Sequence, residues 1–352
     1  MQRPLPERKG KRDPFAPGAN PGLLWNKFFD GWDKNEDPKQ GRSGNRSDAG
    51  RKDGSGEAFS EPAGGPAKQA WIGSFARPVG EGDALEAAGA RVQRLVRALG
   101  GRCEDHITTA PFVTGTGLEH PVENGFVWHH TLGVPYLPAS MVKGLVRAWA
   151  EHWLKHDAAA ISRIFGGAAD AEGVGSVIVF DALPTKPATL MAEVLTPHDG
   201  GWRQGNAPAP SDWHSPVPIP FLVVAPGAQF RFAVAPRPGA GTGREDVALF
   251  MDWLKEALDW IGAGAKTAVG FGRFLQKDAF DEQQKEMKAR QKEEEQQRTE
   301  AENNRPLRVG DEVVDTETHE TGVIIEIAGD EARVEFDDGI EDTVPVTKLK
   351  RR

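Results

Sequence analysis

The stretch GVPYLPASMVKGLVRAW, residues 133–149, marks the point where an irregular segment turns into a helix. Two prolines precede Ser140, and apolar residues then recur at helical spacing. Ser140 is predicted to open the helix, with Lys143 and Arg147 one and two turns further along. A helix N-terminus favours anions, so a lysine in the first turn is better placed if a phosphate also lies there. The stretch therefore indicates a site that holds an anionic backbone.

Two other interpretations fit part of this stretch. The Ser140-x-x-Lys143 spacing occurs in serine acyltransferases that use a lysine base, but these enzymes also need S-D-N and K-T-G elements. The nearest matches in this chain are Ser211-Asp212-Trp213 and Lys266-Thr267-Ala268, and both fail. Alternatively, Ser140 is only an N-cap, which explains the serine and leaves Lys143 unexplained.

The segments around this helix follow the order strand, helix, two or more strands, helix, strand. The second helix is indicated by the spacing of Val247, Phe250, Leu254 and Leu258. This order predicts an α+β fold, a ferredoxin-like (RRM-like) domain with an inserted excursion at 201–216. The strand-like segments are HITTAPFVTGTG (106–117), GSVIVFDAL (175–183), ATLMAEVLT (188–196), IPFLVV (219–224), AQFRFAV (228–234) and GRFLQ (272–276).

Composition shifts divide the 352 residues into four predicted parts. Residues 1–70 form an N-terminal segment and flexible linker, in which the apolar island NPGLLWNKFFDGW (20–32) is expected to dock elsewhere. Residues 71–276 form the ferredoxin-like domain. Residues 277–304 form a charged helical linker without an apolar face. Residues 305–352 contain short alternating strands and form a small all-β barrel.

Charge and cysteine usage exclude several classes of function. The net charge of −9 means that any RNA binding is local or shared with partner subunits. The single cysteine, Cys103, excludes intramolecular disulfides and thiolate zinc clusters. No apolar run approaches the ~18 residues of a membrane span, and MQRPLPERKGKRDPF lacks the apolar region of a secretory signal. We therefore expect a cytoplasmic protein without membrane contact, cofactor or metal.

A second glycine-rich stretch, GAGAKTAVGFGRF (262–274), is a further candidate for ligand contact. It lacks the G-x-x-x-x-G-K-[ST] order of a P-loop. Glycines at this density let backbone N–H groups approach a ligand closely, although an irregular structural loop is the alternative. In a ferredoxin-like sheet the loop before the last strand lies near the start of the first helix. Lys266 and Lys143 are therefore predicted to flank the same RNA segment.

Together the two stretches resemble the RAMP superfamily of CRISPR-associated RNA-binding proteins, over about residues 71–276. The first matches G-x-P-x-[IL]-P-[GA]-S-x-[LIV]-K-G-x-[LIV]-R, with Ala139 and Met141 where the family usually has glycine and serine. The second matches G-x-G-x-x-x-x-x-G-x-G. The likeness is closest to the sixth-subunit family of the type III-B (Cmr) effector complex, with further matches at 21–29, 114–140 and 195–224.

The resemblance implies a non-catalytic RNA-binding subunit at one end of a filament. It would hold the 3′ region of the guide RNA and its duplex with target RNA, and would contact other Cmr subunits, especially the backbone subunit. No catalytic or metal-binding residue is predicted. The predicted RNA-binding residues are Ser140, Lys143, Arg147, Gly262, Gly264, Lys266, Thr267, Gly270, Gly272 and Arg273.

Two rival functions remain open at the level of sequence. One is a guide-processing RAMP endoribonuclease that uses His129 or His130, with His120 nearby, or a carboxylate such as Glu119 or Glu123. The other is a scaffold that contacts only proteins. The barrel at 305–352 resembles Tudor/KOW-like SH3 barrels, and protein docking is favoured over RNA binding there.

Overall fold

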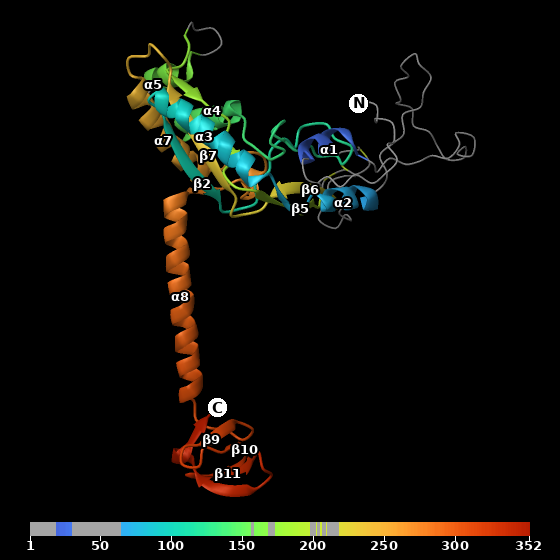
Figure 1. Ribbon diagram of the computed structural model, residues 1–352, viewed down its shortest axis with the longest axis vertical. Helices are drawn as coiled ribbons and strands as arrows, with labels where there is room; N and C mark the ends of the chain where they lie inside the picture. The colour runs from blue at the N-terminus through green and yellow to red at the C-terminus, as the bar shows by residue number, and fades with distance from the viewer. Residues whose placement is uncertain are drawn as a thin grey trace, which may run out of the picture. The chain divides into compact units, whose positions relative to one another are not determined.

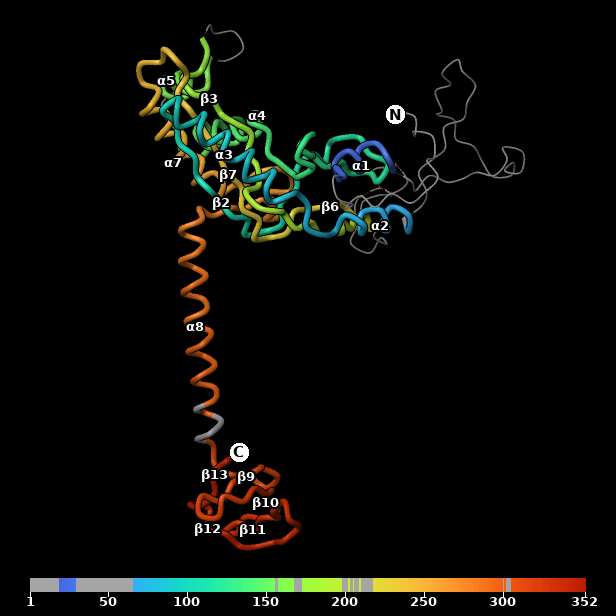
Figure 2. Tube along the Cα trace, in the orientation of Figure 1, coloured from blue at the N-terminus to red at the C-terminus, as the bar shows by residue number. Residues whose placement is uncertain are grey.

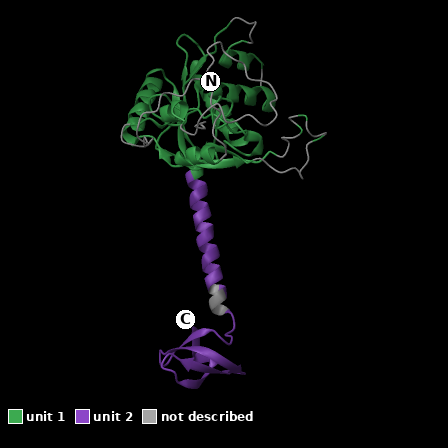
Figure 3. Ribbon diagram, turned by 90° about the vertical axis from the view of Figure 1, so that its right-hand side faces the viewer, with its two compact units in different colours: residues 1–280 green, residues 281–352 purple. Residues whose placement is uncertain are grey.

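Figure 1 shows a computed structural model of the chain, which describes residues 19–29, 65–155, 158–167, 173–197, 202, 205, 209 and 218–352. The chain forms two compact units, residues 1–280 and residues 281–352 (Figure 3). Most of the segment predicted as linker at 33–70 and most of the excursion at 201–216 lie outside the described residues. No helix in the described part is both long and apolar enough to cross a membrane.

The main sheet of the first unit has the predicted ferredoxin-like topology. Its strands are β2 (Arg102–Thr108), β3 (Val177–Val179), β7 (Gln229–Pro236) and β8 (Phe274–Gln276). They pair antiparallel in the order β3-β7-β2-β8, and β4 (Leu183–Pro184) also pairs with β7. Helix α4 (Ala139–Ala148) follows β2, and helix α7 (Gly243–Trp260) follows β7. The chain order is therefore βαββαβ, and the predicted α+β class is confirmed.

Helices cover both faces of this sheet (Figure 2). Successive side chains of a strand point to opposite faces. On β2, Glu104 faces α7; burial raises the pKa of its carboxyl group, and the charges of Asp252 and Lys255 of α7 also act on it. The next side chains in the alternation, Cys103 and Asp105, face helix α3 (Gly82–Ala98), which packs against β2, β4 and β7. The core lies on the α7 side, where Phe230, Phe232, Phe250 and Leu254 are fully buried.

A smaller sheet and two helices form the other end of this unit. Strands β1 (Pro78–Val79), β5 (Ala188–Leu195) and β6 (Ile219–Val224) pair in that order, and helix α2 (Gly65–Ser74) packs on β5 and β6. Helix α1 (Pro21–Lys27) belongs to the apolar island, and its Trp25 is 1% exposed. The Trp25 ring stacks on His120 at 4.6 Å between centroids. The island is therefore docked on the segment between β2 and α4, as expected from its composition.

Short helices complete the packing around α4 and α7. A π-helix, η1 (Trp149–Trp153), continues α4, and helix α5 (Ala158–Phe165) follows it. The buried carboxylate of Asp246, in the first turn of α7, accepts hydrogen bonds from Arg163 of α5, Ser176 and Thr242. Burial alone would raise the pKa of Asp246, but the hydrogen bonds from these three donors lower it below its usual value.

The second unit contains most of helix α8 (Lys277–Asn304) and an all-β domain. The helix spans the stretch predicted as a charged spacer. The strands pair antiparallel in the order β12-β11-β10-β9-β13 around a core that includes Val313, Ile324, Val334 and Phe336. The likeness to Tudor/KOW-like SH3 barrels remains a prediction. The elements are β9 (Glu312–Asp315), β10 (Thr321–Ala328), β11 (Glu331–Phe336), β12 (Glu341–Pro345), 3-10 helix η3 (Val346–Lys348) and β13 (Leu349–Arg351).

Candidate nucleic-acid interface

The start of helix α4 differs by one residue from the prediction. Pro138 is the N-cap, so Ser140 is the second helical residue, and its side chain is exposed. The backbone N–H of Ala139 donates to Asp181 Oδ1 at 2.7 Å. Asp181 follows β3, and only the folded sheet brings its carboxylate to the helix start, where an acidic group is favourable. The alternative that Ser140 is only an N-cap is therefore wrong, because Pro138 is the N-cap and Asp181 accepts the hydrogen bond at the helix start.

Lys143 lies among like charges on α4. It is half-buried, and burial together with the charges of Arg237 and Arg147 lowers the pKa of its ammonium group. Within the described ranges no carboxylate forms an ion pair with Lys143. We call Lys143, Arg147 and Arg237 the cationic row. Like charges repel, so an anion beside the cationic row would offset the repulsion among its three cations.

Each of the two arginines of the cationic row donates a hydrogen bond to a described residue. Arg147 Nε donates to Glu151 Oε1 at 2.7 Å, one turn along the helix. Arg237 Nε donates to the carbonyl of Gly175 at 2.8 Å. Arg237 follows β7 directly, and the pairing of Pro236 with Val177 places it near α4. No motif in the sequence identifies Arg237, because only the topology brings it to Lys143.

Three of the four loop glycines are needed by the packing of the chain itself. A Cβ on Gly262 would lie 2.8 Å from the carbonyl oxygen of Gly272, and a Cβ on Gly264 or on Gly272 would overlap other backbone carbonyls. The loop is held by hydrogen bonds of 2.8 Å from Ala265 N to the carbonyl of Val113 and from Gly272 N to that of Pro111. Close approach of backbone to backbone thus explains these glycines, and their contact with RNA stays a prediction.

The other half of the loop forms an exposed tip. Lys266 has a φ of 61° and precedes the 3-10 helix η2 (Thr267–Val269). Val269 is 73% exposed, and a Cβ on Gly270 would meet nothing within 4 Å. Lys266 Nζ lies 5.1 Å from the centroid of the Phe221 ring. Thr267 and Gly270 are thus accessible to a ligand, whereas Arg273 is held by a 2.9 Å hydrogen bond from its Nη1 to the carbonyl of Asp259.

The glycine loop reaches the start of α4 through the segment after β2. Ala265 bonds to Val113, and the hydroxyl of Thr114 donates to Met141 Sδ at 3.4 Å in the first turn of α4. Met141 therefore contacts protein at the position where the family motif has serine. The cations that act on Lys143 are Arg147 and Arg237. That Lys266 and Lys143 flank one RNA segment stays a prediction.

The open face of an RRM sheet binds RNA by stacking bases on aromatic residues. In this chain Phe230 and Phe232 pair with His106 and Glu104, so they face α7 and are buried. The opposite face carries the ion pair of Arg231 with Asp105, at 2.7 Å, beneath α3. Both faces of this sheet are covered, so bases cannot stack on it as they do in an RRM, and the start of α4 and the tip of the glycine loop are the candidate surfaces.

The histidines named in the sequence differ in their surroundings. His120 Nε2 donates to the carbonyl of Trp25 at 2.8 Å, and its Nδ1 accepts from Val122 N at 3.3 Å, so the ring is held as the neutral tautomer. Burial lowers the pKa of His120 and of His129. His130 is exposed. Within the part of the chain that is described, no three His, Cys, Asp or Glu side chains gather as a metal site.

The ferredoxin-like sheet, the helix motif and the glycine loop define a RAMP domain. Residues 107–275 match the family model of the RAMP superfamily, so this segment belongs to that superfamily, as the motifs indicated. Over 152 residues the chain is 33% identical to "CRISPR system Cmr subunit Cmr6" of Pyrococcus furiosus, covering 41% of this chain and 42% of that protein. Over 154 residues it is 30% identical to "CRISPR system CMR subunit Cmr6" of Saccharolobus solfataricus, covering 43% and 48%.

In each case the chain spans less than half the length of the relative. Among solved structures, a chain of "Cryo-EM structure of the Type III-B Cmr-beta bound to cognate target RNA" is similar, with a TM-score of 0.48 and 23% identity over 60% of this chain and 71% of that one. The "Crystal structure of Cmr6 from Pyrococcus furiosus" gives a TM-score of 0.35 and 26% identity over 50% and 97%.

Proposed function

We propose that this chain is a non-catalytic RNA-binding subunit of a type III-B CRISPR (Cmr) effector complex. It holds the 3′ region of the guide RNA, and its duplex with target RNA, at one end of the filament beside the backbone subunit. The observation that carries the proposal is the cationic row, in which Lys143 is subject to the charges of Arg147 and Arg237 and has no carboxylate partner among the described residues. A phosphate backbone along α4 would supply the missing negative charge.

Two further observations support parts of the proposal. Both curated relatives are named as Cmr6 subunits, which supports membership of a Cmr complex. The engagement of both His120 nitrogens by backbone groups supports a structural role for that histidine. A general base needs a free ring nitrogen within reach of its substrate, so this histidine is a poor candidate for RNA cleavage.

The C-terminal unit has a different task in this proposal. Residues 305–352 contain thirteen Asp and Glu against seven Lys and Arg. A net negative surface disfavours RNA, because affinity for nucleic acid depends on neutralising phosphates. We therefore assign the barrel to docking of a protein partner.

A salt titration of RNA binding tests the proposal. Lys143→Gln removes one phosphate contact, so affinity for single-stranded RNA should fall by roughly tenfold, as for a lost charged hydrogen bond. The slope of log K against log salt should become shallower by about 0.7. Lys288→Gln, on the exposed surface of α8, is the matched control and should change neither quantity. Wild-type affinity and slope for Lys143→Gln would remove the cationic row from the RNA site.

A further inference from the structure

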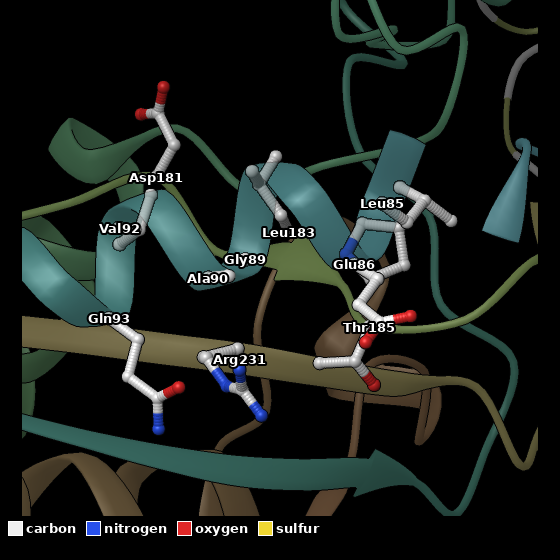
Figure 4. Close-up of a pocket in the computed structure, with 11 residues that line it drawn as sticks. Leu85, Glu86, Gly89, Ala90, Val92, Gln93, Asp181, Leu183, Thr185 and Arg231 are labelled. Carbon is white, nitrogen blue, oxygen red and sulfur yellow. The ribbon is translucent and has the colours of Figure 1, made fainter. Parts of the chain in front are cut away.

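A cavity of about 300 Å³ lies between helix α3 and the main sheet, on the face away from α7 (Figure 4). Its lining includes Asp181, which also accepts the hydrogen bond from Ala139 N at the start of α4, but it contains none of the three residues of the cationic row. Its lining comes from α3, from the segment around β4 and from β7. A volume of this size is at the lower end of what small-molecule sites have, and it accommodates a single nucleoside.

The lining separates apolar from polar groups. Leu85 and Val92 of α3 and Leu183 of β4 supply the apolar surface. Figure 4 shows the polar ends of Gln93 and Arg231 along β7. Glu86 and Thr185 also line the cavity. A ligand here meets hydrocarbon on its faces and hydrogen-bonding groups on its edge, as a flat heteroaromatic ring requires.

Arg231 offers one donor to such a ligand. Its Nε and Nη2 donate to the two carboxylate oxygens of Asp105 at 2.7 and 2.8 Å. Its Nη1 has no hydrogen-bond partner among the residues that the structure describes. A Cβ on Gly89, in the middle of α3, would lie 3.6 Å from this nitrogen. This is an ordinary contact distance, so Gly89 leaves open space that a longer side chain at this position would fill.

The charges select the class of ligand. Asp105 neutralises Arg231, and Glu86 and Asp181 add negative charge to the lining, so the cavity does not favour a phosphate group. It suits a neutral ring whose edge carries an acceptor for Arg231 and donors for Glu86. We propose that this cavity binds a nucleobase, and that guanine fits best. Its O6 accepts from Nη1, and its N1–H and 2-amino group donate to Glu86.

The base has two possible sources, a free nucleoside or an unstacked base of bound RNA. Titration calorimetry of the full chain with guanosine, inosine and adenosine tests the first source. Guanosine should bind one to one, and inosine, which lacks the 2-amino group, should bind several-fold more weakly. Adenosine should not bind measurably. Equal affinities for the three nucleosides would overturn the assignment of Arg231 and Glu86.

Gly89→Leu is the informative variant, because leucine fills the cavity and is a better helix former than glycine. It should abolish guanosine binding without lowering the melting temperature. Ala87→Leu, on the exposed side of the same helix, is the control and should bind normally. Guanosine binding that survives in Gly89→Leu would overturn the proposal.

RNA that contains 6-thioguanine tests the second source. In one outcome, free guanosine fails to bind while the RNA forms a photo-crosslink to the peptides around Gly89 and Leu183. If that crosslink is lost in Gly89→Leu, an RNA base is the ligand. The proposal would be overturned if guanosine did not bind and no such crosslink formed. The proposal does not depend on the cationic row, because Lys143→Gln should leave guanosine binding unchanged. Loss of RNA binding and loss of guanosine binding are thus separate results.

Discussion

Gly264 and Gly270 both have positive φ, 86° and 94°, but they differ in their surroundings. A Cβ on Gly264 would overlap the carbonyl oxygen of Val113 and lie 2.8 Å from the ring of Phe112, whereas a Cβ on Gly270 would enter open space. We therefore expect Gly264→Ala to destabilise the first unit much more than Gly270→Ala. The pair separates the cost of the backbone conformation from the cost of packing.

The expected magnitudes follow from these contacts. An alanine held in the left-handed region costs about 1–2 kcal/mol, and this is the whole expected effect at Gly270. At Gly264 the backbone must also shift, which breaks the hydrogen bond from Ala265 N to the carbonyl of Val113. Leaving such groups unsatisfied adds about 1–3 kcal/mol. The total for Gly264→Ala is then about 2–5 kcal/mol.

Denaturant unfolding followed by tryptophan fluorescence measures both variants. All ten tryptophans precede residue 280, so the signal reports on the first unit alone. The midpoint should fall further for Gly264→Ala than for Gly270→Ala, with similar slopes for both. Equal midpoints, or a larger loss for Gly270→Ala, would refute the argument that glycine at 264 is required by the approach of Val113.

Three further predictions concern the core and the domain boundary. Burial lowers the pKa of His106 to about 4, so the folded state resists its protonation and stability should fall as the pH drops from 6.5 to 4. His106→Leu removes this titration, so its free energy of unfolding should fall by up to about 3 kcal/mol less over that pH range than that of the wild type, as measured by denaturant unfolding at each pH. Asp246→Asn weakens three buried hydrogen bonds and should cost roughly 2–3 kcal/mol in denaturant unfolding, whereas Asp252→Asn on the exposed side of α7 should cost little. A chain that ends at Phe280 should keep the tryptophan unfolding midpoint of the full chain, and aggregation of this truncated chain would show that the barrel belongs to the main fold.

Local patterns in the sequence were sufficient for much of the fold. The alternation of Phe230 and Phe232 with Arg231 predicted the two faces of β7, and these phenylalanines are buried on the α7 side. The absence of an apolar face predicted the solvated helix α8. Both features depend only on the period of a helix or strand, which neighbouring residues determine.

Features that depend on distant segments were not accessible in the same way. Asp181 caps α4 from 42 residues away, so the motif around Ser140 does not indicate it. Arg237 joins Lys143 only because β3 pairs with the end of β7. The close contacts of Gly264 and Gly272 are likewise made across the fold. Glycine spacing alone does not distinguish a loop that approaches a ligand from one that approaches its own backbone.

Photo-crosslinking of the assembled effector complex tests the central claim most directly. Guide RNA with 4-thiouridine throughout its 3′ region is irradiated, and the crosslinked peptides are identified by mass spectrometry. The account predicts crosslinks to the peptides that contain residues 139–147 and Arg237, and their loss in Lys143→Gln. Crosslinks confined to the barrel at 305–352, or none to this chain, would contradict it.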